Sequence, residues 1–158
     1  MASRGDGKQQ EVALLPTAGP RHAPEIRPVG RFPASQRIRK RAEFQEIQAG
    51  GRRVTTPHFV LLLRARERSE RVGSARIGLT VSRRVGNSVV RNRAKRLLRE
   101  AFRATRDLWA DDLDVVIIVK RVTPGMGLAQ VVTEWQRAER AIRRRAVEAR
   151  KDLEKRSA

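Results

Sequence analysis

A dense run of basic side chains stands at residues 91–100, which read RNRAKRLLRE. Glu100 is the single acidic residue of this run, and its cations are Arg91, Arg93, Lys95, Arg96 and Arg99. Guanidinium and ammonium groups donate hydrogen bonds without accepting any, which suits phosphate oxygens. Like charges one helical turn apart repel by roughly 0.2–0.5 kcal/mol per pair, so anions are needed to make the run favourable. The predicted chemistry is the binding of a phosphate backbone.

The spacing of apolar residues predicts that this run belongs to an amphipathic helix over 87–106, which Asn87 or Ser88 can cap. At about 100° per residue, one side of the helix is apolar and carries Val90, Ala94, Leu97, Leu98, Ala101 and Phe102. From Arg83 to Arg106 there are nine basic residues and one acidic residue, mostly on the other side. A solvated helix surface ordinarily mixes both signs, so this basic ridge indicates a nucleic-acid contact.

The whole chain is strongly basic. Its 158 residues include 36 Lys and Arg against 17 Asp and Glu, which gives a net charge of +19. Such a charge favours nucleic acid as a partner, with an anionic membrane surface second. Codon bias can explain why six of the basic residues are Lys and 30 are Arg, but not the size of the charge.

Composition also excludes several classes of protein. The chain has no Cys, so it holds neither a disulfide nor a thiolate metal site. Its longest apolar runs, FVLLL and VVIIV, are five residues each, whereas a membrane-spanning helix needs about 20. The N-terminal residues lack the long apolar stretch of a secretion signal. We expect a soluble protein of the cytoplasm.

The elements that must position the ridge follow from Pro, Gly and apolar spacing. Residues 1–33 carry five prolines and are expected to form a disordered extension. Residues 34–149 are expected to form one RNA-binding domain, and residues 150–158 a frayed charged tail. A helix is predicted near 41–49, ended by the glycine pair that follows it.

Three strands are predicted in the domain. Residues 59–63 are apolar on both faces and indicate a buried strand. Residues 77–81 alternate apolar residues with small ones, which leaves room on one face for a ligand. Residues 115–119 indicate a central, parallel strand. A long amphipathic helix follows from Leu128, and its basic side is either an RNA contact or a solvated surface of mixed charge.

Catalytic groups of the chain's own are not indicated. Asp111, Asp112 and Asp114 could suggest a metal-dependent nuclease, but they precede a strand and no second cluster completes a site. His22 and His58 have no neighbouring ligand for zinc. The Gly-Met-Gly of 125–127 is typical of a turn rather than of a nucleotide-binding loop. We therefore expect no catalytic residue, no metal site and no bound cofactor in the protein itself.

Residues 76–103, RIGLTVSRRVGNSVVRNRAKRLLREAFR, resemble the motif of the bacterial ribonuclease P protein subunit, including the triplet Arg91-Asn92-Arg93. The flanking EFQEIQAGGRR and HFVLLL are similar to that family's first helix and early strand. The resemblance covers about 37–146. It implies an α/β (α+β) two-layer sandwich of order αβββαβα, similar to ribosomal proteins, with a left-handed βαβ crossover.

The resemblance also implies a function. In that family a large RNA uses Mg²⁺ to remove the 5′ leader from precursor tRNA, and the protein subunit assists it without catalytic residues. The expected partners are ribonuclease P RNA and precursor tRNA, with no membrane and no protein partner. A structural RNA-binding protein of the ribosomal type is the alternative, because it also needs a basic ridge on a small sandwich.

Carried over by position, the resemblance assigns two groups of residues. The catalytic RNA would be contacted by Arg83, Arg84, Asn87, Arg91, Asn92, Arg93, Lys95, Arg96, Arg99 and Arg103. A cleft for the single-stranded leader would be lined by Phe44, Arg53, Phe59, Leu62, Thr80 and Ser82. Gln48 and Leu62 stand where relatives often carry an aromatic residue, which predicts weaker base stacking here. For Phe59, core packing is as compatible with the pattern as a place in the cleft.

Overall fold

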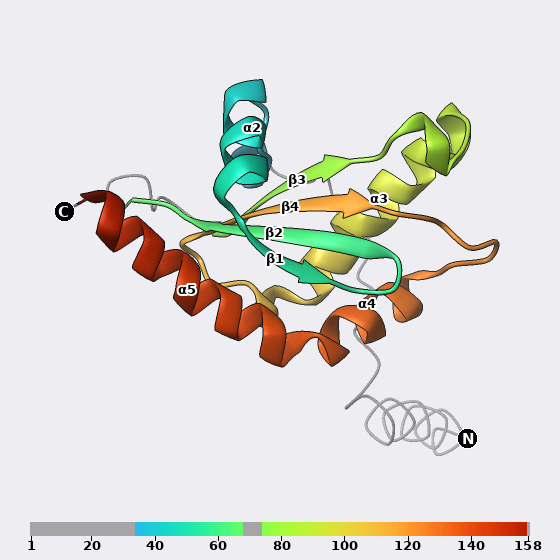
Figure 1. The fold of residues 1–158 in the computed structure, drawn as a ribbon. Helices are drawn as coiled ribbons and strands as arrows, with labels where there is room; N and C mark the ends of the chain where they lie inside the picture. The colour runs from blue at the N-terminus through green and yellow to red at the C-terminus, as the bar shows by residue number, and fades with distance from the viewer. Residues whose placement is uncertain (1–33, 68–73, 158) are drawn as a thin grey trace, which may run out of the picture.

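The computed structural model describes residues 34–67 and 74–157, which fold around a four-stranded sheet (Figure 1). The strands are β1 (Arg52–Thr55), β2 (Phe59–Ala65), β3 (Arg76–Thr80) and β4 (Leu113–Val119), in the sheet order β1-β2-β4-β3. Strand β4 pairs parallel with β3 and antiparallel with β2, so the prediction of a central strand with a parallel neighbour is confirmed. The predicted extension at 1–33 lies outside the described residues.

Four α-helices cover the sheet: α2 (Arg41–Gly50), α3 (Ser88–Ala104), α4 (Leu128–Arg137) and α5 (Glu139–Ser157). Short 3-10 turns lie at Ala34–Gln36, Arg83–Val85 and Arg106–Leu108. Helix α2 stands against one face of the sheet, and the other three helices pack on the opposite face (Figure 1). The mixed α/β fold and its element order are confirmed, with α2 forming a further partial layer.

Alternation along the strands divides the buried side chains between the two faces. Phe59, Leu61 and Leu63 of β2 join the main core beneath α3, α4 and α5. Leu62 points the other way and joins a smaller cluster beneath α2, together with Ile47 of that helix. The sheet therefore has one closed face and one face that α2 covers only in part.

Helix α3 connects the parallel neighbours β3 and β4. In Figure 1 both strands run to the right, β4 lies below β3, and α3 passes behind them. This arrangement is a left-handed βαβ crossover, the opposite of the usual right-handed connection. It places α3 along the β3 edge of the sheet.

Two features of the C-terminal region differ from the sequence prediction. The helix predicted from Leu128 is interrupted at Ala138, whose N–H is bonded to the carbonyl of Trp135. Residues 150–157 are not frayed, because they continue α5 and are held by side chains. Arg52 donates to both carboxylate oxygens of Asp152 at 2.7 Å, and Arg150 donates to Asp112 at 2.8 Å. Among the described residues, no helix has both the length and the apolar character that crossing a membrane requires.

Candidate nucleic-acid interface

The start of α3 is fixed by local contacts. The Asn87 side chain accepts a hydrogen bond from the backbone N–H of Val90 at 3.0 Å, which confirms Asn87 rather than Ser88 as the cap. Gly86 precedes it, and a Cβ at this position would lie 2.9 Å from the Cβ of Val90. The chain therefore needs glycine here to turn tightly from β3 into the helix.

The predicted amphipathicity of α3 is observed. Ala94, Leu98, Ala101 and Phe102 are buried, the last three in the main core, so the basic residues lie toward solvent. Arg93 and Arg96 are exposed, as are Arg83 and Arg84 in the turn that precedes the helix. The remaining ridge cations are half-buried, namely Arg91, Lys95, Arg99 and Arg103. The structure thus brings the residues assigned to the catalytic RNA together on one helix and its N-terminal corner.

A pocket of about 230 Å³ lies between this ridge and α2. It is lined by Arg37, Ile38, Arg39, Phe44, Ile77, Gly78, Leu79, Lys95 and Arg99. All its charged lining residues are cations. Burial and the nearby charge of Arg37 lower the pKa of Arg99, because both oppose a further positive charge. An anionic group is the chemistry that this pocket would stabilise.

Arg37 and Arg39 were not singled out from the sequence. They lie in the basic segment QRIRK, residues 36–40, which reads locally as an ordinary charged turn before a helix. The backbone of this segment reaches β3, since the N–H of Ile38 donates to the carbonyl of Ile77 at 2.9 Å. Only that long-range contact brings the two arginines to the ridge.

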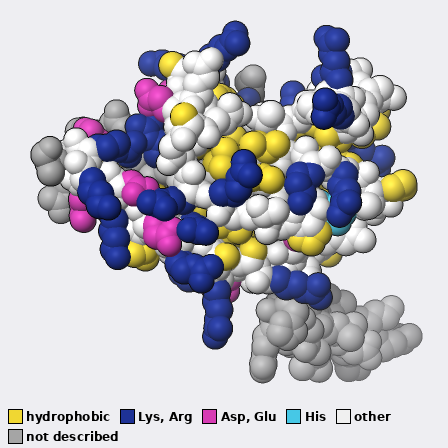
Figure 2. Space-filling view, viewed as in Figure 1, with side chains coloured by type: hydrophobic (Ala, Val, Ile, Leu, Met, Phe, Trp, Pro, Cys, Tyr) yellow, Lys and Arg dark blue, Asp and Glu magenta, His cyan; other side chains and the backbone are white. Residues whose placement is uncertain are grey.

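The leader cleft that the family resemblance implies would lie on the partly covered face of the sheet beside α2. One row of residues crosses it from Arg53 through Leu62 and Val116 to Gly78, as the strand registers require. The next row runs from Thr55 through Val60 and Ile118 to Thr80, with Val60 and Ile118 only partly buried. Figure 2 shows hydrophobic side chains gathered at the centre of this face, with Lys and Arg around them.

Phe44 forms the wall of this cleft on the α2 side. Its ring is half-buried and approaches β3 so closely that a Cβ at Gly78 would lie 2.7 Å from the ring atom Cζ. Thr80 is half-buried and Ser82 is exposed beyond the end of the strand. Arg53 is exposed on β1 at the far side. The structure therefore places Phe44, Arg53, Thr80 and Ser82 around one surface.

Phe59 does not belong to this cleft. Its side chain is 1% exposed and faces the main core, where its ring meets that of Trp135 at 6.0 Å between centroids. The sequence could not decide its direction, because both faces of β2 are apolar. Val60, the next residue, faces the cleft together with Ile118, and neither was predicted. Leu62 does lie on the cleft side but is 3% exposed, so it forms the floor beneath α2.

Ion pairs hold α2 in place above the sheet. Arg76 donates to Asp114 at 2.7 and 2.8 Å and to Glu43 of α2 at 2.5 Å. These carboxylates raise the pKa of the Arg76 guanidinium well above its ordinary value, although burial acts against them. Arg64 of β2 donates to Glu46 of the same helix at 2.5 Å. The wall that carries Phe44 is therefore fixed to three strands of the sheet.

Comparison with known proteins agrees with this geometry. The family model described as Ribonuclease P matches residues 32–143. The chain belongs to the Ribonuclease P family. It is 40% identical to the ribonuclease P protein component of Syntrophus aciditrophicus over 100 aligned residues. The alignment covers 63% of this chain and 81% of that relative. The corresponding protein of Geobacter sp. strain M21 is 35% identical over 114 residues, covering 72% of this chain and 94% of the relative.

Solved structures of the Ribonuclease P family share the fold. The RNase P protein of Staphylococcus aureus superposes with a TM-score of 0.54 at 29% identity, covering 65% of this chain and 90% of that one. The family match ends at residue 143, within the first turns of α5, so the rest of that helix lies beyond it.

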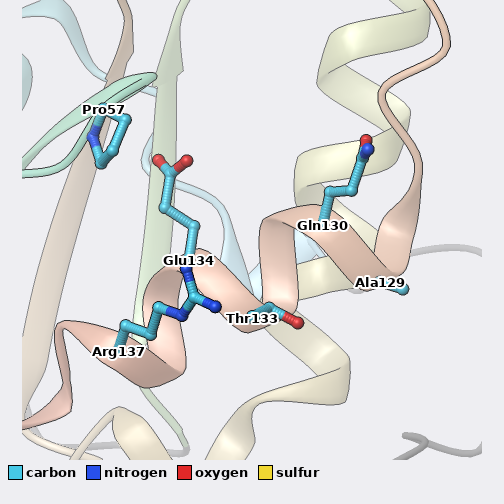
Figure 3. Close-up of a pocket in the computed structure, with 6 residues that line it drawn as sticks. All are labelled: Pro57, Ala129, Gln130, Thr133, Glu134 and Arg137. Atoms are coloured by element: carbon cyan, nitrogen blue, oxygen red, sulfur yellow. The ribbon is translucent and has the colours of Figure 1, made fainter.

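The described part of this family member contains no group of three or more His, Cys, Asp or Glu that could hold a metal ion. Two of the three carboxylates that suggested a nuclease have other partners, since Asp112 accepts from Arg150 and Asp114 from Arg76. A hollow of about 370 Å³ beside α4 is lined by Pro57, Ala129, Gln130, Thr133, Glu134 and Arg137 (Figure 3).

The acid in that hollow is also engaged. Glu134 accepts hydrogen bonds from the Thr56 hydroxyl at 2.6 Å and from the backbone N–H of His58 at 3.1 Å. Its second oxygen lies 2.6 Å from the His58 ring. These contacts join α4 to the loop between β1 and β2, so Glu134 and His58 have a structural role.

Proposed function

We propose that the chain is the protein component of ribonuclease P, and that it binds the catalytic RNA and the 5′ leader of precursor tRNA. The observation that supports this most directly is the pocket shared by the basic ridge and the cleft. Lys95 and Arg99 of the ridge and Phe44 of the cleft line the same pocket. One continuous surface can therefore contact two RNA molecules at once.

In this proposal the ridge positions the catalytic RNA. Its exposed guanidinium groups contact phosphates, and each contact releases counterions from the RNA. Asn87 and the arginines of the preceding turn extend the surface around the corner of α3. The apolar side of α3 stays in the core, so the cations are presented on a rigid support.

The cleft holds the single-stranded leader. Phe44 offers a ring for one base, which is worth about 1–3 kcal/mol per stacked base. Gln48 is exposed and Leu62 is buried, so neither adds a second stacking surface. Val60, Ile118 and Thr80 provide a shallow apolar and hydroxyl floor, and Arg53 supports the backbone from the far side.

The protein supplies no reacting group in this proposal. Hydrolysis of the phosphodiester bond at the leader is assigned to the RNA subunit with Mg²⁺, and the buried Asp112 and Asp114 of the chain are engaged by arginines. The protein adds positive charge between two polyanions, which reduces their repulsion and lowers the Mg²⁺ concentration that cleavage requires. In this proposal the protein acts in the cytoplasm, where it meets precursor tRNA.

Reconstitution tests this function. The purified chain is combined with a bacterial ribonuclease P RNA and precursor tRNA at a series of low Mg²⁺ concentrations. We expect cleavage at the mature 5′ end that requires both the protein and the RNA. Tight RNA binding without any stimulation, even with the RNA of the same organism, would instead support a structural RNA-binding protein of the ribosomal type.

A further inference from the structure

The outward side of α5 carries a second row of cations. Ile142, Ala146 and Ala149 are buried and define the inward side of this helix. At about 100° per residue, the direction opposite to them carries four exposed cations, the α5 stripe, around the exposed Val147. The α5 stripe consists of Arg140, Arg144, Lys151 and Lys155.

Two acidic residues of α5 form ion pairs with arginines that do not belong to the stripe. Asp152 pairs with Arg52 of β1 at 2.7 Å, and Glu148 pairs with Arg145 at 2.7 Å. Both acids have lowered pKa values because these guanidinium groups stabilise their charged forms. Figure 2 shows magenta and blue side chains mixed where α5 passes β1. Half-buried Glu148 and exposed Glu154 flank the stripe on its two sides, and its four cations outnumber these two acids.

The helix that carries the stripe is firmly attached to the sheet. The Arg52–Asp152 and Arg150–Asp112 pairs hold its C-terminal half, so the stripe cations have a rigid support. From Arg140 to Lys155 the rise is about 22 Å at 1.5 Å per residue, enough to follow several phosphates. Three of the four stripe residues lie beyond residue 143, where the family match ends. They are a property of this chain rather than of the matched region.

We propose that the α5 stripe binds the phosphate backbone of a double-stranded segment of the catalytic RNA, as a second contact separate from the basic ridge. This inference rests on the proposed function, which supplies the RNA. Helix α5 lies along β1 and β2 and α3 along β3, so the two basic surfaces flank opposite edges of the sheet (Figure 1). The stripe has no aromatic side chain on which unpaired bases could stack, whereas duplex RNA is recognised through phosphates and shape.

A tethered cleavage reagent tests the location. The chain has no cysteine, so Val147→Cys and Val89→Cys each create a unique attachment point for an iron chelate that generates hydroxyl radicals. Val147 is 47% exposed within the stripe, and Val89 is 73% exposed at the start of the ridge. We expect each position to cleave its own segment of ribonuclease P RNA in the assembled holoenzyme, with the cuts from position 147 falling in a duplex.

The outcomes separate this inference from the proposed function. Cleavage from position 89 without cleavage from position 147 overturns the α5 contact alone. Cuts from position 147 confined to unpaired RNA overturn the duplex assignment. Absence of cleavage from both positions, with both proteins folded, overturns the proposed function as well.

Salt dependence provides a second test. Arg144→Gln with Lys151→Gln removes two stripe charges and leaves intact the Arg52–Asp152 and Arg150–Asp112 ion pairs that attach α5. The slope of log affinity against log salt should fall by about 1.4–1.8, which shrinks the affinity ratio between 50 and 200 mM salt about tenfold. The matched control, Arg41→Gln with Arg137→Gln, removes two exposed charges elsewhere. Equal slopes for the two double variants would overturn the inference.

Discussion

Gly78 is the position where a single methyl group should disturb the leader cleft without disturbing the fold. It lies in β3 directly beneath Phe44, and a Cβ there would stand 2.7 and 2.8 Å from the ring atoms Cζ and Cε1. Ordinary carbon contacts begin near 3.5 Å, so in Gly78→Ala the ring must move by about 0.8 Å or more. Those atoms are the far end of a side chain, which makes displacement of the ring easier than displacement of the strand.

The expected magnitudes follow from this geometry. Moving Phe44 off its rotamer destabilises the fold by about 0.5–1.5 kcal/mol. Replacing glycine by alanine within a strand stabilises the fold by about 0.5–1 kcal/mol. The free energy of unfolding should therefore change by no more than about 1 kcal/mol. Complete loss of one stacked base would weaken leader binding by about 5-fold to 150-fold. A displaced ring should give a loss near the lower limit, about fivefold.

The assay compares holoenzymes assembled with each variant. Dissociation constants are measured for precursor tRNA with its 5′ leader and for mature tRNA, and the ratio of the mature-tRNA constant to the precursor constant isolates the leader contact. Gly78→Ala should reduce this ratio, and it should have no further effect when Phe44→Leu has already removed the ring. An undiminished ratio, or an equal additional loss in the Phe44→Leu background, would refute the placement of the leader against Phe44.

Three further predictions concern charge. Asp114→Ala removes a buried carboxylate from beside the buried Arg66 and the half-buried Arg76, and should lower the free energy of unfolding by about 3–5 kcal/mol in urea titrations. The pKa of Asp152 is lowered by Arg52, so its contribution to stability is present above the ordinary carboxyl pKa near 4 and is lost as pH falls through the folded value. Arg52→Gln should accordingly flatten the loss of stability below about pH 4 in thermal unfolding. Replacing Arg91 and Arg93 by Ala should weaken binding of ribonuclease P RNA and lower its salt slope by about one unit per lost contact.

Each of these predictions has its own control. Asp107→Ala removes an exposed acid and should change stability little, so equal effects at both positions would contradict the role of the buried pair. An acid transition unchanged by Arg52→Gln would show that the Asp152 contact does not stabilise the fold. Replacing exposed Arg41 and Arg137 by Ala removes the same charge as the Arg91 and Arg93 variant. An equal decrease of the salt slope in both variants would contradict the assignment of Arg91 and Arg93.

Helix α3 was predictable because its determinants are local. Its apolar residues recur at the helical period, Asn87 reaches the N–H of Val90 three residues away, and the like-sign charges lie within the same helix. The motif at 76–103 adds a strand and a turn to the same continuous stretch. Period and capping act between neighbours in the chain, so the sequence alone contains them.

The C-terminal helices show where periodicity fails. The apolar spacing continues across Ala138, so the pattern could not indicate the break between α4 and α5. The charged residues after Lys151 also looked unattached, because their partners are distant. Asp152 pairs with Arg52, which lies 100 residues earlier in the chain. Only the packing of α5 along β1 brings these two residues together.

The sequence by itself determined the charge of this protein, its ridge and its family resemblance. The tertiary structure decided which residues share a surface. Phe59 and Val60 are equally apolar neighbours, and their assignment to core or cleft depends on which face of β2 meets α3, α4 and α5. Arg37 reaches Arg99 only because the segment before α2 pairs with β3. Both outcomes depend on contacts between distant segments, which are fixed when the chain packs and leave no local pattern to read.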